Sequence, residues 1–387
     1  MANISLTRRC RRNCSYCFAK HELSCNFETD MQPETFEAVL GFLKRSCIPE
    51  ARLLGGEPTE HPLFKDYVTQ AIEKGFKVLV FSGGIIPRPV LFYMAGLPTE
   101  KFSMILNAAN LHESPESLIN RQIEICQTLG AKVKLGINIQ SSNENPAYVF
   151  DWVKKYSLRR AVRVGIANPI WGGNNDFFRL RGPYEIPIFE RFLTMGAEMG
   201  IDISLDCGFT PCMFSQEFVS DHIDFFTHNK TAHSTQRGPT KPVNQLEGAC
   251  DAADNNTEVQ FADSLDTKNE NKETLLQRMD PIGMRCGPVV DILPEGDCIS
   301  CYALSRFLRL PLPSEGNLND LVSCFNDKLS SALPLGVFRE CLECWYRQQG
   351  VCNGGCRSRR ALRLRPNSLI MLGLETDGEY SKHAQTL

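Results

Sequence analysis

The stretch from Ile4 to Cys17 reads I-S-L-T-R-R-C-R-R-N-C-S-Y-C and carries the strongest signal in the chain. Its apolar start, residues 4–7, is typical of a short strand, and three cysteines with C-x3-C-x2-C spacing follow at Cys10, Cys14 and Cys17. Thiolates packed this closely repel one another unless a metal compensates their charge. Zinc sites and most iron–sulfur clusters use four protein ligands, so three cysteines on a 4Fe–4S cluster would leave one iron open to a small molecule.

A glycine-rich stretch follows the next strand-like run. Residues 51–54, A-R-L-L, precede Gly55-Gly56-Glu57-Pro58. Two adjacent glycines permit close approach of another backbone or a ligand, and backbone carbonyls together with the Glu57 carboxylate are acceptors suited to a cation. Both stretches therefore predict ligand-binding loops at the carboxyl ends of strands.

Helical segments that end in glycine and lead into strands recur through residues 1–206. Gly75, Gly130 and Gly200 each close such a segment, which is typical of helix-to-strand connections. The alternation predicts a parallel sheet in an α/β fold, with about six units forming a partial (β/α)6 TIM-like barrel whose active site lies at the C-terminal strand ends. The predicted strands are 4–7, 51–54, 76–80, 102–107, 133–135, 160–167 and 201–205, and the predicted helices are 33–46, 63–74, 115–129, 145–156 and 186–199.

Composition narrows the class of protein. The 387 residues carry a formal net charge of -3, which provides no basic surface for nucleic acid. The chain has no signal-peptide core and no long apolar span, so we expect no membrane association. Clustered cysteines among a total of 17 then favour metal ligands over disulfides, and we predict a reduced, cytoplasmic enzyme.

The second half of the chain departs from this pattern. We predict a core domain at 1–206, a bridging region at 207–285 and a cysteine-rich domain at 286–387. Residues 227–272 within the bridge are too polar to order themselves alone, which predicts a mobile insertion or a segment that folds on a partner. The last domain is loop-rich and is expected to depend on metal for stability.

These features together resemble the radical S-adenosylmethionine (radical SAM) superfamily, in its branch with a C-terminal SPASM domain. The resemblance covers nearly the whole chain except 227–272. It implies that Cys10, Cys14 and Cys17 hold a 4Fe–4S cluster whose open iron binds S-adenosylmethionine (SAM). It also implies that Gly55, Gly56, Glu57 and Pro58 contact the methionyl ammonium and that the backbone of Tyr16 meets the adenine. Ser82, Asn107, Asn138 and Ile166, at or near the ends of later strands, are further candidates for contacts with SAM or substrate.

SPASM domains usually bind two auxiliary 4Fe–4S clusters through seven cysteines, often with an eighth upstream. Six of the seven are matched here, and no cysteine follows Cys356. The resemblance assigns Cys286, Cys301 and Cys356 to cluster I, with Cys207, Cys212 or Cys298 as its fourth ligand. It assigns Cys341, Cys344 and Cys352 to cluster II, whose fourth ligand could be another side chain, a substrate atom or nothing. Loss of cluster II and a zinc ribbon built from the last four cysteines are the alternatives.

The resemblance implies reductive cleavage of SAM to a 5′-deoxyadenosyl radical, which takes a hydrogen atom from the substrate. We expect the substrate to be a ribosomally synthesised precursor peptide, because SPASM proteins mostly modify peptides or proteins. The alternatives are a small metabolite as substrate, or a non-catalytic zinc-binding module. Nine residues precede Cys10, so we expect a separate peptide-recognition protein rather than a fused domain, and an electron donor such as flavodoxin or ferredoxin.

Overall fold

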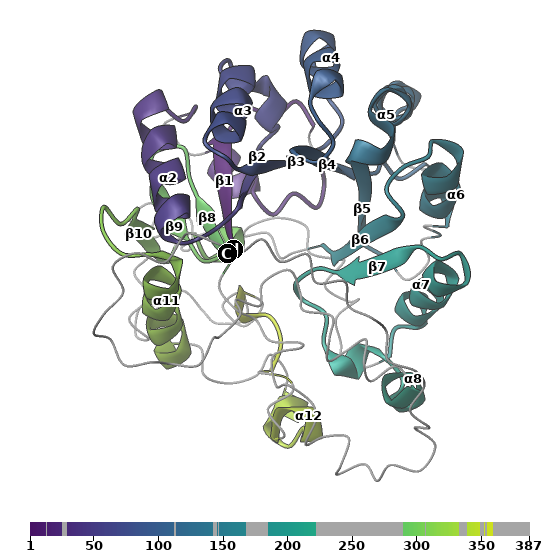
Figure 1. Ribbon diagram of the computed structural model, residues 1–387. Coiled ribbons are helices and arrows are strands. Elements are labelled where there is room, and N and C mark those ends of the chain that lie inside the picture. Colours follow the sequence, from purple (N-terminus) through teal and green to yellow (C-terminus); the bar gives the residue numbers. More distant parts are fainter. Residues whose placement is uncertain are drawn as a thin grey trace, which may run out of the picture.

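A single twisted sheet organises the computed structural model (Figure 1). The structure describes residues 1–12, 14–24, 29–111, 114–141, 145, 147–167, 185–221, 289–305, 307–332, 339–348, 352 and 354–358. The strands are β1 Ala2–Thr7, β2 Glu50–Gly55, β3 Lys77–Ser82, β4 Phe102–Asn107, β5 Val133–Ile139, β6 Ala161–Ile166, β7 Asp202–Leu205, β8 Val290–Ile292, β9 Asp297–Ile299 and β10 Arg309–Pro311. Their order in the sheet is β10-β9-β8-β1-β2-β3-β4-β5-β6-β7.

Strands β1 to β7 are all parallel to their neighbours, and β8 pairs in parallel with the other side of β1. The chain then turns back, and β8, β9 and β10 pair antiparallel. The two ends of the sheet, β7 and β10, are not hydrogen-bonded to each other in the described residues. This open, curled sheet confirms the predicted partial barrel.

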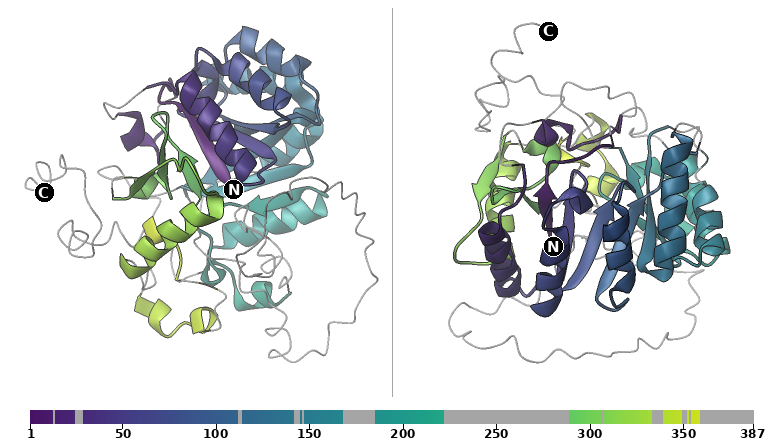
Figure 2. Two further views of the ribbon diagram at one scale, coloured as in Figure 1. Left: turned by 60° about the vertical axis from the view of Figure 1, so that its left-hand side comes forward. Right: turned by 90° about the horizontal axis from the view of Figure 1, so that it is seen from above.

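Helices cover the outer side of the curl (Figures 1 and 2). The α-helices are α1 Lys20–Leu23, α2 Pro33–Arg45, α3 Phe64–Glu73, α4 Arg88–Gly96, α5 Glu116–Leu129, α6 Tyr148–Lys155, α7 Pro187–Glu198, α8 Gln216–Asp221, α11 Leu318–Ala332 and α12 Trp345–Gln348. Short 3-10 helices are η1 Pro58–Glu60, η2 Gly130–Lys132, η4 Pro211–Met213, η6 Tyr302–Leu304 and η7 Arg339–Leu342. Each long helix buries one apolar face against the sheet, as expected for a connection between parallel strands.

Local sequence signals account for most of these elements. The predicted strands and helices of residues 1–206 are all present, with ends shifted by a few residues. Gly75, Gly130 and Gly200 have φ of 90°, 52° and 59°, the positive values that a glycine after a helix adopts without strain. Helices α1 and α4 were not predicted, and α4 contains a proline, Pro89. In the structure Pro89 lies within the first turn, where its missing N–H costs no hydrogen bond.

The C-terminal strands join residues of the first and third predicted domains in one sheet. Asn3 of β1 lies opposite Asp291 of β8. Helix α11 begins beside the end of α2, where the Leu318 N–H donates to Ser46 Oγ at 2.9 Å. The predicted domain boundaries remain a prediction, and the insertion 227–272 and Cys286 lie outside the described residues.

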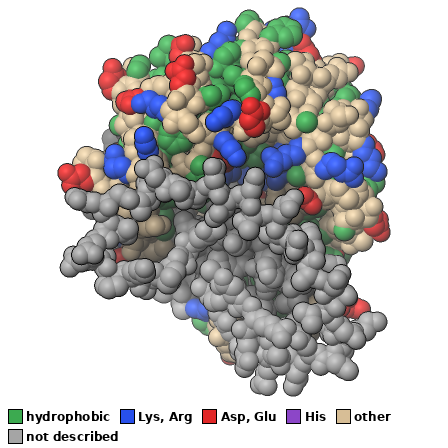
Figure 3. All heavy atoms as spheres, in the orientation of Figure 1, with side chains coloured by type: hydrophobic (Ala, Val, Ile, Leu, Met, Phe, Trp, Pro, Cys, Tyr) green, Lys and Arg blue, Asp and Glu red, His purple; other side chains and the backbone are tan. Residues whose placement is uncertain are grey.

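Charged side chains of both signs are interspersed on the described part of the face in Figure 3. Among the helices that the structure describes, none combines the length and the apolar character needed to cross a bilayer.

Candidate active site

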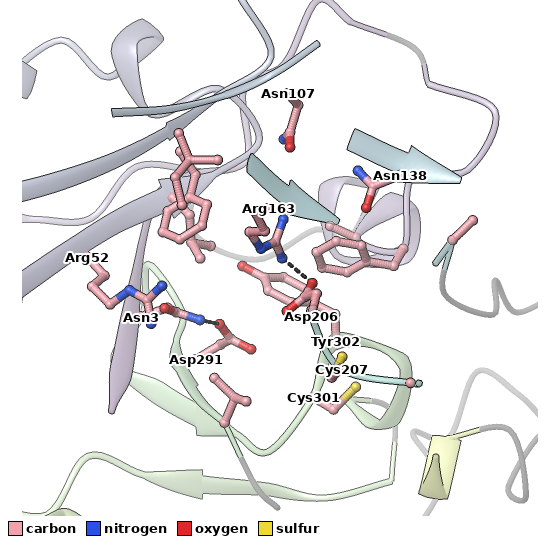
Figure 4. A pocket seen from close by; sticks show the side chains of 18 of the residues that line it. Asn3, Arg52, Asn107, Asn138, Arg163, Asp206, Cys207, Asp291, Cys301 and Tyr302 are labelled. Carbon is pink, nitrogen blue, oxygen red and sulfur yellow. Dashed lines mark hydrogen bonds and ion pairs between the residues drawn. The ribbon is translucent and has the colours of Figure 1, made fainter. Parts of the chain in front are cut away.

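A cavity of about 840 Å³ lies on the inner side of the sheet (Figure 4). Residues from β1 to β7 line it, together with residues near β8 and β9. The lining contains these predicted site residues: Cys10, Cys14, Tyr16, Cys17, Gly55, Gly56, Ser82, Asn107, Asn138, Cys207, Cys301 and Cys356. The structure therefore brings both cysteine groups and the strand-end polar residues to one space.

The loop after β1 brings the three N-terminal cysteines together through tight turns. The Cys14 N–H donates to Arg12 O at 3.1 Å, and the Cys17 N–H donates to Cys14 O at 3.3 Å. All three thiols are free, and burial raises the pKa of Cys10 to about 11, with Glu57, Cys14 and Cys17 adding to the shift.

No group of three or more His, Cys, Asp or Glu side chains in the described residues lies close enough to bind a single metal ion. A cubane cluster differs, because each thiolate binds its own iron. Three thiols on one loop are a donor set of the kind that iron–sulfur clusters use.

Two glycines bring the next loop against the cysteine loop. The Gly56 N–H donates to Thr7 O at 2.8 Å, and the Glu57 N–H donates to Arg9 O at 2.7 Å. A Cβ atom on Gly56 would lie 2.2 Å from Arg9 O and 2.9 Å from Cys10 Cβ. Only glycine allows this approach, so Gly56 sets the position of the first cysteine.

We expect Gly56→Ala to displace the cysteine loop and to lower SAM binding at least tenfold, because the contact at 2.2 Å is with rigid backbone. Gly96→Ala is the matched control, since a Cβ there meets nothing within 4 Å. It should leave binding unchanged and stabilise α4 by up to about 1 kcal/mol. Calorimetric titration of the reconstituted proteins with SAM measures the difference. Equal affinities in the two variants would contradict the role given to Gly56.

Glu57 follows the two glycines and precedes η1, and it is buried, with 2% of its surface exposed. Its Oε1 accepts from Thr59 Oγ1 at 2.7 Å, and its Oε2 accepts from Ser82 Oγ at 3.0 Å and from the Gly83 N–H at 2.8 Å. Burial outweighs these donors and raises the pKa of Glu57 to about 7. Glu57 and Pro58 do not line the cavity, and Ser82 acts here by holding Glu57.

Asn107 and Asn138 point into the cavity from β4 and β5 (Figure 4). A Cβ on Gly136 would lie 3.1 Å from Asn107 Oδ1, and one on Gly165 would lie 2.5 Å from Asn138 Oδ1. These strand glycines therefore leave room for both amides. Asn107 Oδ1 is buried and has no hydrogen-bond partner in the described structure, so it can accept from a ligand.

Tyr16 and Ile166 differ in their surroundings. The Tyr16 side chain hydrogen-bonds Asn138, and burial raises the pKa of Tyr16 to about 12. Ile166 is 2% exposed in the core, and its neighbour Ala167 lines the cavity instead. Asn168, which follows them, lies outside the described residues.

Arg12 is a cavity residue that the sequence analysis missed. Its Nη1 donates to Gly83 O at 2.8 Å and to Asn107 O at 3.0 Å. Gln122 of α5 holds the same two carbonyls from outside, at 2.9 and 2.8 Å. Arg12 therefore ties the cysteine loop to the ends of β3 and β4. Its position among other arginines in R-R-C-R-R conceals this role.

Charged side chains inside the curl were also missed. Lys134, Arg163 and Arg52 project inward from β5, β6 and β2. Arg163 pairs with Asp206, and Asn3 Nδ2 donates to Asp291 Oδ1 at 2.7 Å (Figure 4). The described cavity lining holds seven Lys or Arg residues and four Asp or Glu residues. A signal exists in the sequence, because each cation stands between two apolar residues of its strand.

Comparison with known proteins decides the family of the first half of the chain. Residues 4–167 match the family described as the Radical SAM superfamily. These residues form a radical SAM domain. Domains of this superfamily use a 4Fe–4S cluster and SAM, and the triad and Gly55–Pro58 turn lie within the matched range.

Two known proteins illustrate the likeness. The S-adenosylmethionine-dependent nucleotide dehydratase of Selenomonas ruminantium is 29% identical over 103 residues, which are 26% of this chain and 34% of that protein. The chain thus matches about a third of that relative's length.

Streptococcus suis SuiB bound to S-adenosylmethionine has a TM-score of 0.55 at 14% identity, over 95% of this chain and 75% of SuiB. The same protein bound to its precursor peptide SuiA gives 0.56 at 13%. At these identities the likeness to SuiB shows a shared fold.

Ion pairs join the radical SAM domain to the C-terminal strands. Arg8 contacts Glu22 at 3.5 Å and Glu295 at 2.8 Å, while Arg309 contacts the same two acids at 2.7 and 3.0 Å. Glu22 is 2% exposed. Removing one partner of such a buried network costs about 3–5 kcal/mol, so these pairs fix the segment after Cys17 against the turn between β8 and β9.

The later cysteines separate into two groups. Burial, followed by Asp206, Cys356 and Cys301, raises the pKa of Cys207, which places Cys207 beside Cys301 and Cys356. Figure 4 shows Cys207 and Cys301 next to each other. Cys298, a third alternative for this site, is fully buried in β9 and does not line the cavity.

Cys212 belongs to the second group. Burial raises its pKa first, and then Cys341 and Cys344 add to the shift. Cys352 interacts in turn with Cys212 and Cys341.

Asp291 gives a pH-dependent test of the charged interior. Burial raises its pKa from 3.8 to about 7. Between these values the folded chain holds a proton that the unfolded chain loses, so the contribution of Asp291 to stability falls as the pH rises from about 4 to 7. Asp291→Asn removes this cost, and its amide can donate to Asn3 Oδ1, which has no hydrogen-bond partner in the described residues.

We expect Asp291→Asn to raise the midpoint of thermal unfolding by roughly 5 °C more at pH 8 than at pH 5. Circular dichroism of the anaerobically purified protein at both pH values measures the gain. Asp66→Asn, at an exposed position of α3, is the control and should change little at either pH. The same gain at both pH values would show that Asp291 keeps an ordinary pKa.

Proposed function

We propose that this chain is a radical SAM enzyme that cleaves SAM reductively and takes a hydrogen atom from a substrate bound in the inner cavity. One observation carries the proposal: Cys10, Cys14, Cys17 and the Gly55–Gly56 turn border the same 840 Å³ cavity. A cluster with an open iron and a SAM molecule on it would then face enclosed space in which a radical is protected from water.

In this proposal the three cysteines hold the cluster and Glu57 binds the methionyl ammonium. With one electron from a flavodoxin or ferredoxin, the bound cofactors would supply methionine and a 5′-deoxyadenosyl radical, which becomes 5′-deoxyadenosine on taking hydrogen from the substrate. Arg12 holds the cysteine loop against the end of β3. Asn138 holds the Tyr16 side chain through a hydrogen bond. The described cysteines form no disulfides, which suits a reducing cytoplasm, the predicted location.

We further propose a ribosomally synthesised precursor peptide as the substrate. SuiB, which shares the fold over 94% of this chain, has been crystallised with its precursor peptide SuiA. The thiol groups around Cys301 and Cys352 support the proposal, because auxiliary clusters can accept the electron released when a peptide is oxidised. A separate peptide-recognition protein remains part of this prediction.

A small anionic metabolite is the second candidate substrate. The excess of cations over acids in the cavity lining favours an anionic group. A curated relative acts, by its name, on a nucleotide.

The experiment for the first step is anaerobic incubation of the reconstituted enzyme with SAM and dithionite, with 5′-deoxyadenosine measured by chromatography. Formation of 5′-deoxyadenosine supports the radical SAM activity, and its absence from a protein carrying its full iron content would overturn it. Co-expression with a short precursor peptide from the neighbouring genes then tests the substrate. An altered peptide mass supports a peptide, whereas an unchanged peptide with turnover of a metabolite supports the second candidate.

A further inference from the structure

Four thiols from two distant parts of the chain converge beside the last 3-10 helix. Cys341 lies in η7 and Cys344 precedes α12. The Arg347 N–H donates to Cys344 O at 3.1 Å, and Arg347 Nη1 donates to Cys341 O at 3.2 Å. The Cys352 N–H donates to Tyr346 O at 3.0 Å, which brings the third thiol back to the same turn.

The fourth thiol, Cys212, comes from η4, beyond the end of β7. The segment is held by the Ile186 N–H, which donates to Met213 O at 2.8 Å, and by Met213, which is fully buried. Thr210 Oγ1 lies 3.1 Å from Cys212 Sγ. Cys212 interacts electrostatically with Cys341 and Cys344, and Tyr346 interacts with both Cys344 and Cys212. Cys212, Cys344 and Tyr346 therefore lie near one another.

The turn between Cys207 and Cys212 sends the two thiols to different groups. Gly208 has φ of 101°, a left-handed value that reverses the chain direction after Cys207. Cys207 then lies with Cys301 and Cys356, and Cys212 lies with Cys341 and Cys344. One strand end therefore supplies a cysteine to each group.

We propose that Cys212, Cys341, Cys344 and Cys352 are the four ligands of one 4Fe–4S cluster, in which Cys212 replaces the cysteine that the related pattern has after Cys356. This inference rests on the proposed function, because it assumes an iron–sulfur enzyme. With every iron bound by a thiolate, the cluster has no open position, so it transfers electrons and does not bind substrate.

A cluster suits these thiols better than zinc does. Zinc holds four ligands at about 2.3 Å from one centre, and among the described residues no group of three or more His, Cys, Asp or Glu side chains is arranged to hold a single metal ion. Four separate irons accept a wider arrangement of sulfurs.

The test uses the full chain with Cys10→Ala, Cys14→Ala and Cys17→Ala, so that SAM cleavage plays no part in the result. After anaerobic reconstitution with iron and sulfide, brief ferricyanide oxidation removes iron far more readily from clusters that lack a fourth thiolate. The resulting 3Fe–4S cluster has a distinct signal in electron paramagnetic resonance.

Adding Cys212→Ala to this background should increase the signal by about one cluster per chain, as should Cys341→Ala. Cys324→Ala, on α11, is the matched control and should add none. An unchanged signal with Cys212→Ala beside an increased one with Cys341→Ala would overturn the inference. One zinc per chain that is lost with Cys341→Ala would also overturn it.

Cys212→Ser, which keeps the side-chain size, separates ligand loss from misfolding through its circular dichroism spectrum. Failure of the wild type to form 5′-deoxyadenosine would count against the proposed function alone.

Discussion

Cys14→Ala should abolish formation of 5′-deoxyadenosine and should remove about four irons per chain. Cys14 is the middle ligand of the loop, and its carbonyl also accepts from the Cys17 N–H at 3.3 Å. Two remaining thiols cannot hold a cubane that already has one iron without a protein ligand. We expect a loss of activity of at least a thousandfold, measured by chromatography of anaerobic assays with iron determined on the same samples.

Cys47→Ser is the matched control for this experiment. Cys47 is an exposed cysteine after α2 that forms no disulfide and does not line the cavity, so its replacement should preserve both iron content and activity. Retention of 5′-deoxyadenosine formation by Cys14→Ala would contradict the assignment of the triad. Loss of iron without loss of activity would do the same.

The parts of the site that lie close together in sequence were predictable. Cys10 to Cys17 and Gly55 to Pro58 each form one loop, and the strand before each loop determines its place at the sheet edge. Gly75, Gly130 and Gly200 could be predicted as helix ends because a positive φ favours glycine whatever the tertiary context.

The interior of the cavity could not be predicted in the same way. Arg52, Lys134 and Arg163 come from three strands, and their meeting depends on the register and the curl of the sheet. The sequence signal of each is one charge between two apolar neighbours, which is also compatible with a strand at a solvated edge. The ion pair of Arg163 with Asp206 and the electrostatic interaction of Arg52 with Asp291 need contacts between residues far apart in the chain.

The separation of Cys207 from Cys212 shows the same limit on a smaller scale. Both were candidates for cluster I, because both follow the end of the last predicted core strand. A turn at Gly208 lies between them, and Cys207 and Cys212 lie near different cysteines. The sequence does not show which later cysteines each of them will meet. Spacing predicts that cysteines bind metal, whereas the tertiary fold determines how they are grouped.

Glu57→Gln should weaken SAM binding by about 10- to 100-fold at pH 8, because a hydrogen bond to a charged group contributes about 1.5–3 kcal/mol. The amide keeps the size of the side chain but not its charge, and it replaces one acceptor oxygen with a donor facing Thr59, Ser82 or Gly83. Glu37→Gln, an exposed change on α2, is the control. Calorimetric titration of the reconstituted proteins with SAM measures both.

The pH dependence of the same titration identifies the charge itself. Since burial raises the pKa of Glu57 to about 7, the carboxyl is protonated below this pH and binds an ammonium weakly. We expect wild-type affinity to fall up to tenfold per pH unit below 7, and the affinity of Glu57→Gln to stay level over that range. Titration of the SAM amine affects both proteins equally, so it cancels in the ratio of the wild-type affinity to the Glu57→Gln affinity. A ratio that does not change between pH 6 and pH 8 would mean that the ammonium is held by groups other than Glu57, and that the Gly55–Pro58 turn acts through its backbone alone.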